Sequence, residues 1–168
     1  NIKELGCDVC KDEKVAKVNQ WWGRMHSAAK FRANKYDVVR CLWKGMGVPA
    51  VMYAANVLNW TEHDFNKLEV AQNKIGRVAL GANRMVGAEA IRGDMGWSTF
   101  GERISKSVLS YKARLERMQE GRWAKKVYNH NFRNSKWIKS CARMVRKCNL
   151  KKEAVVGGYG WRLMDERD

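Results

Sequence analysis

Apolar side chains recur at three- and four-residue steps along most of this chain, which holds a single proline in 168 residues. That period places apolar groups on one face of a helix, whereas a half-buried strand needs a period of two. Amphipathic windows cover residues 14–32, residues 62–80 and the stretch that follows Thr99. The pattern predicts an all-α fold, a helical bundle of about six to seven helices.

Residues around the proline predict where the second and third helices begin and end. Asn34 can cap the second helix, which is expected to stop near residues 45–47, where two glycines precede the proline. Pro49 suits the first turn of a third helix, because an N–H at that position has no partner inside the helix. Residues 50–58 are apolar on nearly every side, which predicts a central helix.

Further signals mark the next helix ends. Thr61 and Asp64 form a capping-box pattern, with aspartate in place of the usual glutamate. Gly81 is a natural stop for the helix that they start. A short helix is expected over residues 89–92, with Gly93 as its stop.

The last third of the chain is predicted to hold three more helices and a tail. Ser98 or Thr99 caps a long helix, and shorter ones are expected near residues 122–128 and 135–147. Residues 153–168 have no helical period, which predicts an irregular C-terminal tail. A short strand pair, a docked extended arm and the start of a following domain remain open for this segment.

Most of the tryptophans fall on the apolar helix faces, although stacking on nucleic-acid bases is the alternative use of such residues. Core packing is predicted for Trp22, Trp43, Trp60, Trp97, Trp123 and Trp137. The same core is predicted to contain Leu68, Ile75, Ile104 and Leu115. Trp21 points off the face that holds Trp22, so it is the tryptophan expected to be exposed.

Positive charge is concentrated in one part of the chain. The net charge is +16, and residues 101–152 hold sixteen Lys/Arg against three acids, a net of +13. A strongly basic half fits a polyanion, most simply a nucleic-acid backbone. Other anionic partners and a plain solvated face remain open. Phosphate neutralisation is largely independent of base sequence, so the pattern predicts affinity without base readout.

The candidate phosphate-binding residues are cations that lie off the apolar faces. They are Arg40, Lys44, Lys106, Lys112, Arg114, Arg117, Arg122, Lys125, Lys126, Arg133, Lys136, Lys139, Arg143, Arg146 and Lys147.

Three sequence blocks stand in a fixed order: NKYDVVRCLWKGMGVPAVMY from residue 34, LEVAQNKIGRVALGANR from residue 68, and EAIRGDMGWSTF from residue 89. Together they resemble the region just downstream of the polymerase core in reverse transcriptases of LINE-type non-LTR retrotransposons. The resemblance covers residues 34–137. Many relatives have a glycine after the tyrosine of the first block, where this chain has Ala54. Inside a helix that replacement is expected to cost little.

The resemblance implies a thumb and post-thumb region that grips the template-primer duplex or structured RNA. Together with the charge distribution and the helical pattern, it predicts an N-terminal linker and amphipathic helix (residues 1–33), a thumb-like helical core (34–100), a strongly basic helical region (101–152) and a tail (153–168). It also makes Arg40 and Lys44 plausible contacts to the nucleic-acid backbone. An intracellular, nuclear location is a further implication.

The polymerase active site itself is predicted to lie outside this chain. Two-metal catalysis needs clustered carboxylates about 4 Å apart, and the sequence has no Asp-Asp pair. No catalytic residue is assigned, and the chain is expected to be inactive alone. The resemblance puts Mg²⁺, the palm and the fingers elsewhere in a longer polypeptide, and the terminal residues Asn1 and Asp168 fit that view, although processing would give the same ends.

Two other functional readings remain open. One is a free-standing, co-opted helical module that binds nucleic acid or protein with no polymerase attached, and the other is a structural fragment of a degenerate element copy. Metal and membrane roles are not expected. Five cysteines are an odd number, and the Cys7–Cys10 spacing lacks the second pair that a zinc site needs. No apolar run reaches membrane-span length.

Overall fold

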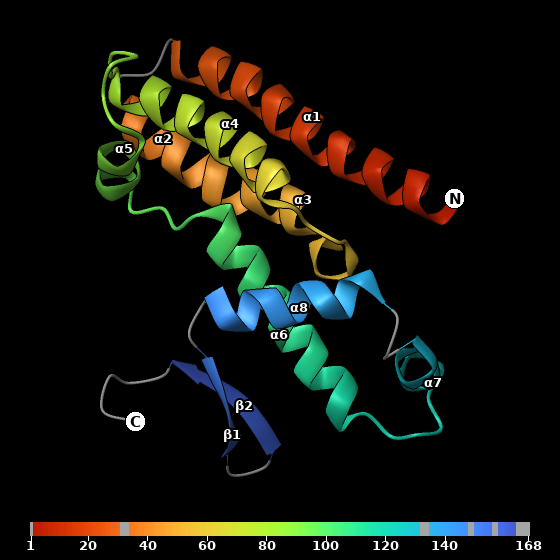
Figure 1. Cartoon of the computed structure of the whole chain (residues 1–168). Helices are drawn as coiled ribbons and strands as arrows, with labels where there is room; N and C mark the ends of the chain where they lie inside the picture. Colours follow the sequence, from red (N-terminus) through yellow and green to blue (C-terminus); the bar gives the residue numbers. More distant parts are fainter. Residues whose placement is uncertain (1, 31–33, 132–134, 148–149, 156–157, 164–168) are drawn as a thin grey trace. The chain divides into compact units, whose positions relative to one another are not determined.

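The computed structural model describes residues 2–30, 34–131, 135–147, 150–155 and 158–163 (Figure 1). Within these ranges the regular elements are eight α-helices, one π-helical turn, one 3₁₀ turn and a two-stranded hairpin. The chain divides into two compact units. Unit 1 comprises Asn1–Ala55 and Trp60–Arg103, and unit 2 comprises Asn56–Asn59 and Ile104–Asp168.

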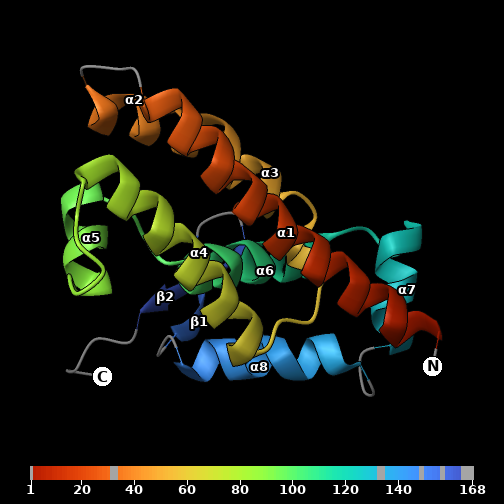
Figure 2. The ribbon, with the colours of Figure 1, turned by 90° about the horizontal axis from the view of Figure 1, so that it is seen from above.

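The all-α helical bundle predicted from the sequence is confirmed. The helices of unit 1 are α1 (Ile2–Lys30), α2 (Lys35–Leu42), α3 (Val48–Met52), α4 (Glu62–Leu80) and α5 (Ala88–Met95). The long helix α6 (Phe100–Arg117) begins in unit 1 and continues into unit 2. Helix α1 runs alongside α4, and α2 packs against both of them (Figures 1 and 2).

Helix α1 starts well before the predicted residue 14, and the second helix does not stop at residues 45–47. A π-helical turn (Trp43–Gly47) carries it into α3 without a break. Pro49 lies at the start of α3. The wider turn before it suits a residue that lacks an N–H and whose ring crowds the preceding turn.

The central helix predicted for residues 50–58 is wrong. Helix α3 ends at Met52, and the chain turns at Tyr53 and Ala54. Ala54 has φ 53°, a left-handed conformation that costs a non-glycine residue about 1–2 kcal/mol. The replacement of glycine by alanine at this position is therefore not free, contrary to the expectation for a helix interior. Tyr53 and Val57 are 79% and 51% exposed, so apolar composition here does not mean burial.

Capping signals locate most helix starts correctly. Asn34 accepts a hydrogen bond from the Asp37 N–H and caps α2. Thr99 and Glu102 exchange hydrogen bonds at the start of α6, with N···O distances of 3.1 Å in both directions. Gly81 ends α4 with φ 62°, as its position predicts. Helix α5 instead ends at Gly96, with φ 60°, and not at Gly93.

Asp64 joins the cap of α4 to an ion pair from α1. Its carboxylate accepts hydrogen bonds from the Thr61 N–H at 3.0 Å and the Thr61 hydroxyl at 2.8 Å, and Lys11 Nζ lies 3.2 Å away. Burial alone would raise the pKa of Asp64, but the hydrogen bonds from Thr61 and Lys11 hold that pKa below its usual value.

Replacing Asp64 with Asn is therefore expected to destabilise the fold in a pH-dependent way. A carboxyl pKa that is lower in the folded state gives stability that is present above the unfolded pKa and is lost as pH falls through the folded value. We expect a loss of about 1–2 kcal/mol at pH 7 that shrinks toward pH 3, measured by urea unfolding. The control is Glu89→Gln in the first turn of α5, where Gly87 provides no side-chain cap. An equal loss at both pH values for Asp64→Asn would contradict this assignment.

An aromatic cluster forms the centre of unit 1. Trp43 is fully buried, and its ring centroid lies 5.9 Å from that of Trp97 and 6.1 Å from that of Phe100. A Cβ on Gly76 would approach Ile91 to 2.5 Å, so the glycine allows α5 to pack closely on α4. Trp97 is 5% exposed, which agrees with the core packing predicted for it.

A small hydrogen-bond network holds two polar side chains of this core, Gln72 and Glu69. Gln72 is fully buried, and its Oε1 accepts hydrogen bonds from Trp43 Nε1 at 3.4 Å and Arg103 Nη1 at 3.0 Å. Glu69 accepts hydrogen bonds from the N–H groups of Phe100 and Gly101. The network holds the first turn of α6 against α4, which explains how a glutamine can occupy an apolar face.

Two of the tryptophans predicted to be buried are exposed. Trp22 is 41% exposed and its ring lies against His26, with centroids 5.6 Å apart. The buried face of α1 is narrow and centres on Val18 and Met25, so the large indole extends past its edge. Trp21, predicted to be the exposed one, is half-buried. Trp123 is 80% exposed.

Unit 2 is held together around the second half of α6. Its other helices are α7 (Trp123–Asn131) and α8 (Lys136–Lys147), close to the predicted ranges. Trp137 of α8 donates a hydrogen bond from Nε1 to the Asn56 carbonyl at 2.9 Å, and its ring meets Tyr111 of α6 edge-on. Tyr128 of α7 donates a hydrogen bond from its hydroxyl to the Glu116 carboxylate at 3.3 Å.

The segment after α8 is not irregular throughout. Strands β1 (Leu150–Val155) and β2 (Gly158–Leu163) pair antiparallel, with Leu150 opposite Leu163 and Val155 opposite Gly158. This is the strand pair that the sequence left open for the tail. Aromatic residues in β2 favour a strand.

Candidate nucleic-acid interface

Helix α8 carries cations along one side and apolar groups along the other. The exposed cations on the side away from its buried face are Lys136, Lys139, Arg143 and Arg146, here called the α8 stripe. At 3.6 residues per turn they fall within about 80° of the helix circumference and span about 15 Å. Helix α8 contains no acidic residue, so no carboxylate of the helix itself offsets the positive charge of this stripe.

The opposite face of α8 fixes the orientation of the stripe. Cys141 and Met144 are buried there, and Trp137 contacts Tyr111 of α6. Burial raises the pKa of the Cys141 thiol to about 11, so this cysteine is a neutral packing group at physiological pH. Because this face is anchored on α6, the α8 stripe points away from that helix.

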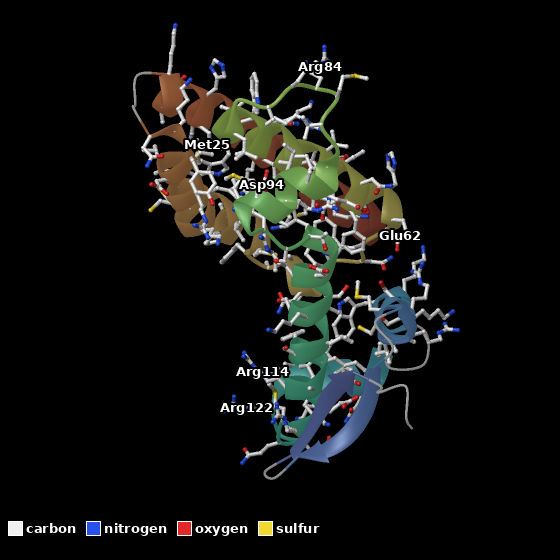
Figure 3. The ribbon with its side chains drawn as sticks, turned by 90° about the vertical axis from the view of Figure 1, so that its left-hand side faces the viewer. Met25, Glu62, Arg84, Asp94, Arg114 and Arg122 are labelled. Atoms are coloured by element: carbon white, nitrogen blue, oxygen red, sulfur yellow. The ribbon has the colours of Figure 1, made fainter. Side chains whose placement is uncertain are left out.

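Helix α6 has a basic side of its own. Lys106, Arg114 and Arg117 are exposed on one side together with Ser110, and we call these four residues the α6 stripe. Helical spacing places this side opposite the buried face of α6. Figure 3 shows Arg114 on the side of α6 that faces away from α8.

Among the described residues of α6 and α8, the exposed positive charge therefore lies on two outward stripes and not on one continuous surface. Tyr111, Lys112 and Glu116 occupy the side of α6 toward α8, since Tyr111 contacts Trp137 and the other two influence the pKa of Cys141. Lys112 is half-buried and pairs with Glu116 at 3.6 Å. It does not belong to the α6 stripe.

Lys125, a candidate from the sequence, has a structural role. It is 8% exposed, and its Nζ donates a hydrogen bond to the Glu116 carbonyl at 2.9 Å and lies 3.6 Å from the Glu120 carboxylate. The Glu116 carbonyl is in the last turn of α6, where a lysine satisfies an unpaired carbonyl and the helix dipole. Lys125 thus caps α6, which the sequence pattern could not distinguish from an exposed cation.

The neighbouring residues of α7 are exposed instead. Arg122, Lys126 and Trp123 all face solvent, and Lys126 Nζ lies 5.3 Å from the centroid of the Trp123 ring. Figure 3 shows Arg122 on the same side of α6 as Arg114. Trp123 was predicted to pack in the core, because its sequence context does not differ from that of the buried tryptophans.

The second predicted cluster lies in unit 1. The guanidinium of Arg40 is half-buried over the Tyr36 ring, with 5.6 Å between its Cζ and the ring centroid. Lys44 is exposed in the π-helical turn. Tyr36 in turn donates a hydrogen bond to the Asp94 carbonyl at 3.1 Å. Arg40 is therefore partly a packing residue, whereas Lys44 extends into solvent.

Some predicted residues lie outside what the structure describes. The side chains of Arg133 and Lys147 are in this group, as are the thiols of Cys7 and Cys148. Among the described cysteines, Cys10 and Cys41 are exposed and carry free thiols. Within the described residues, no group of three or more His, Cys, Asp or Glu side chains is arranged to hold a metal ion. None of the described helices is long and apolar enough to cross a membrane.

Comparison of the chain with protein-family models, with curated proteins and with solved structures gives no match.

Proposed function

We propose that this chain binds nucleic acid through the phosphate backbone, as a non-catalytic part of an RNA-directed DNA polymerase. The α8 stripe is the observation that carries the proposal. It presents two lysines and two arginines over about 15 Å of helix with no acid on the same helix.

The length of the α8 stripe fits a row of phosphates. Each strand of a B-form duplex carries one charge per about 3.4 Å of helix axis, so about 15 Å corresponds to about four phosphates. Arginine can hold a phosphate in bidentate geometry, and lysine adds a mobile point charge. Such contacts fix the position of the protein on the duplex and supply affinity, but they do not distinguish one base sequence from another. Binding that depends little on sequence is what a polymerase thumb requires.

The polymerase part of the proposal rests on the sequence resemblance of residues 34–137. The chemistry would belong to a palm elsewhere in the same polypeptide, because this chain has no Asp-Asp pair. An aromatic-x-Asp-Asp strand motif upstream in the parent sequence would support this reading. Its absence, together with a start codon close to Asn1, would favour a free-standing binding module.

The salt dependence of binding tests the proposal. The logarithm of the affinity for a short DNA or RNA/DNA duplex is expected to fall linearly with the logarithm of salt concentration, with a slope of about −0.9 for each B-form phosphate contacted. Fluorescence anisotropy between about 50 and about 200 mM salt gives this slope, and four contacts imply a loss of about a hundredfold over that range.

Two controls accompany this measurement. Duplexes of unrelated sequence are expected to bind with the same affinity and slope, because phosphates are common to all of them. Heparin, a polyanion without the duplex spacing, shows how much of the affinity is charge alone. Failure to bind any duplex at about 50 mM salt, or an affinity that does not change with salt, would refute the proposed function.

A further inference from the structure

We propose that Trp123 on α7 is a stacking platform for an unpaired base of the bound nucleic acid. This inference rests on the proposed function and adds to the duplex-binding α8 stripe a separate site for single-stranded nucleotides.

The first argument is the exposure of an apolar strip on α7. Trp123 is 80% exposed and Val127, one turn later on the same side, is 54% exposed. His130 lies a further turn along and is also exposed. The helix is anchored from its other side by Lys125 and Tyr128, so the strip is held outward by the fold.

The second argument is the charge that surrounds the indole. Lys126 Nζ lies 5.3 Å from the Trp123 ring centroid, and Arg122 precedes the tryptophan and is exposed. No acidic side chain is seen paired with Lys126 in the part of the chain that the structure describes. An aromatic face flanked by cations matches a nucleotide, which offers a flat base and a phosphate together. An apolar protein partner would gain nothing from these cations.

The third argument is continuity with the α6 stripe. Arg117 ends α6, and Arg122 follows after the short turn that leads into α7. Figure 3 shows Arg114 and Arg122 on the same side of α6. A single strand that continues past the duplex end and follows the α6 stripe would reach Trp123, where an unpaired base would stack.

The test compares a blunt duplex with the same duplex carrying a single-stranded overhang, using the full chain and fluorescence anisotropy. For the wild type, the overhang is expected to increase affinity. Trp123→Ala is expected to lower affinity for the overhang duplex and for a single strand by about five- to a hundredfold, and to leave blunt-duplex affinity unchanged. Trp123→Phe is expected to restore part of the loss, because phenylalanine also offers a stacking face.

Tyr53→Ala is the matched control, since it removes another exposed aromatic ring, 79% accessible, from unit 1. It is expected to change neither affinity. The inference is overturned if Trp123→Ala leaves overhang binding unchanged, or if it weakens blunt and overhang duplexes equally. It is likewise overturned if Trp123→Ala alters self-association in sedimentation while nucleic-acid binding stays constant. If the wild-type chain still binds duplex with a salt-dependent affinity in any of these cases, the proposed function stands and only the stacking site is refuted. If the wild-type chain binds no nucleic acid at all, both the proposed function and the stacking site are refuted.

Discussion

Replacing Lys136, Lys139, Arg143 and Arg146 with glutamine is expected to abolish measurable duplex binding. At about 0.1 M salt a slope of about 0.9 per contact gives each phosphate contact a contribution of about eightfold, so four contacts amount to between about three and about four orders of magnitude. The effect is expected to be the same for all duplex sequences.

Single glutamine variants make this expectation quantitative. Each is expected to weaken binding by about eightfold and to reduce the salt slope by about 1. Glutamine has nearly the helix propensity of lysine and arginine, so far-UV circular dichroism is expected to remain unchanged. Substitution of Arg143 and Arg146 also removes cations near the C-terminal end of α8, which affects helix stability by about 1 kcal/mol or less.

A matched control removes the same charge from unit 1. Arg24, Lys35, Lys74 and Arg84 are exposed, and they supply two arginines and two lysines. Their replacement by glutamine lowers the net charge equally and is expected to weaken binding far less. Equal losses in both quadruple variants would mean that only total charge matters. Full affinity in the α8 variant would show that its cations are a solvated face, and the proposed interface would be wrong.

The sequence predicted the helical class and most helix starts because the signals for these features are local. A capping residue acts within one turn of its own position, as Asn34 and Thr99 do. Amphipathic period likewise predicts the buried side of a long helix, and Leu68, Ile75, Ile104 and Leu115 are all buried as expected. The predictions failed where burial depends on how far a neighbouring element extends.

Residues 50–58 illustrate that limit. Their apolar composition predicted a buried helix, but the chain leaves the helix at Tyr53, and the Lys14 ammonium of α1 donates hydrogen bonds to the carbonyls of Val51 and Tyr53. Lys14 and Val51 are 37 residues apart, so the local sequence pattern around residues 50–58 cannot predict this interaction. A glycine preference at position 54 in the resembled family was the one available hint, since a left-handed residue follows the end of many helices.

The candidate interface was only partly predictable for the same reason. Net charge identifies a basic region, but it could not assign each cation to solvent or to a partner. Lys125 and Lys126 are adjacent, yet one caps α6 and the other lies over an exposed indole. The division into an α6 stripe and an α8 stripe depends on Trp137 contacting Tyr111. That contact sets the rotation of α8, and no single-helix pattern contains it.

The largest effect on stability is expected from Trp43→Ala. The indole is fully buried, lies against Trp97 and Phe100, and donates a hydrogen bond to Gln72. A Cβ on Gly47 would approach the same ring to 2.2 Å, so the backbone of the π-helical turn packs directly against the indole. Truncation leaves a cavity that these neighbours cannot fill without moving, and such changes cost about 3–5 kcal/mol.

Urea unfolding followed by far-UV circular dichroism measures this loss. With a urea m-value of about 2 kcal/mol per M, a loss of about 4 kcal/mol moves the midpoint by about 2 M. Trp123→Ala is the matched control, because it makes the same chemical change at a site that is 80% exposed. Its effect is expected to stay within about 0.5 kcal/mol.

The comparison of these two variants separates the two uses of tryptophan in this chain. Trp43→Ala is expected to lower stability and to affect nucleic-acid binding only through unfolding, so duplex affinity measured well below its unfolding midpoint should be normal. Trp123→Ala is expected to keep stability and to lose overhang binding. Equal destabilisation by both substitutions would contradict the burial difference between Trp43 and Trp123. In that event the packing described for unit 1 around the π-helical turn would be wrong. Removal of a fully buried indole leaves a cavity, and such a cavity lowers the free energy of unfolding by a large amount.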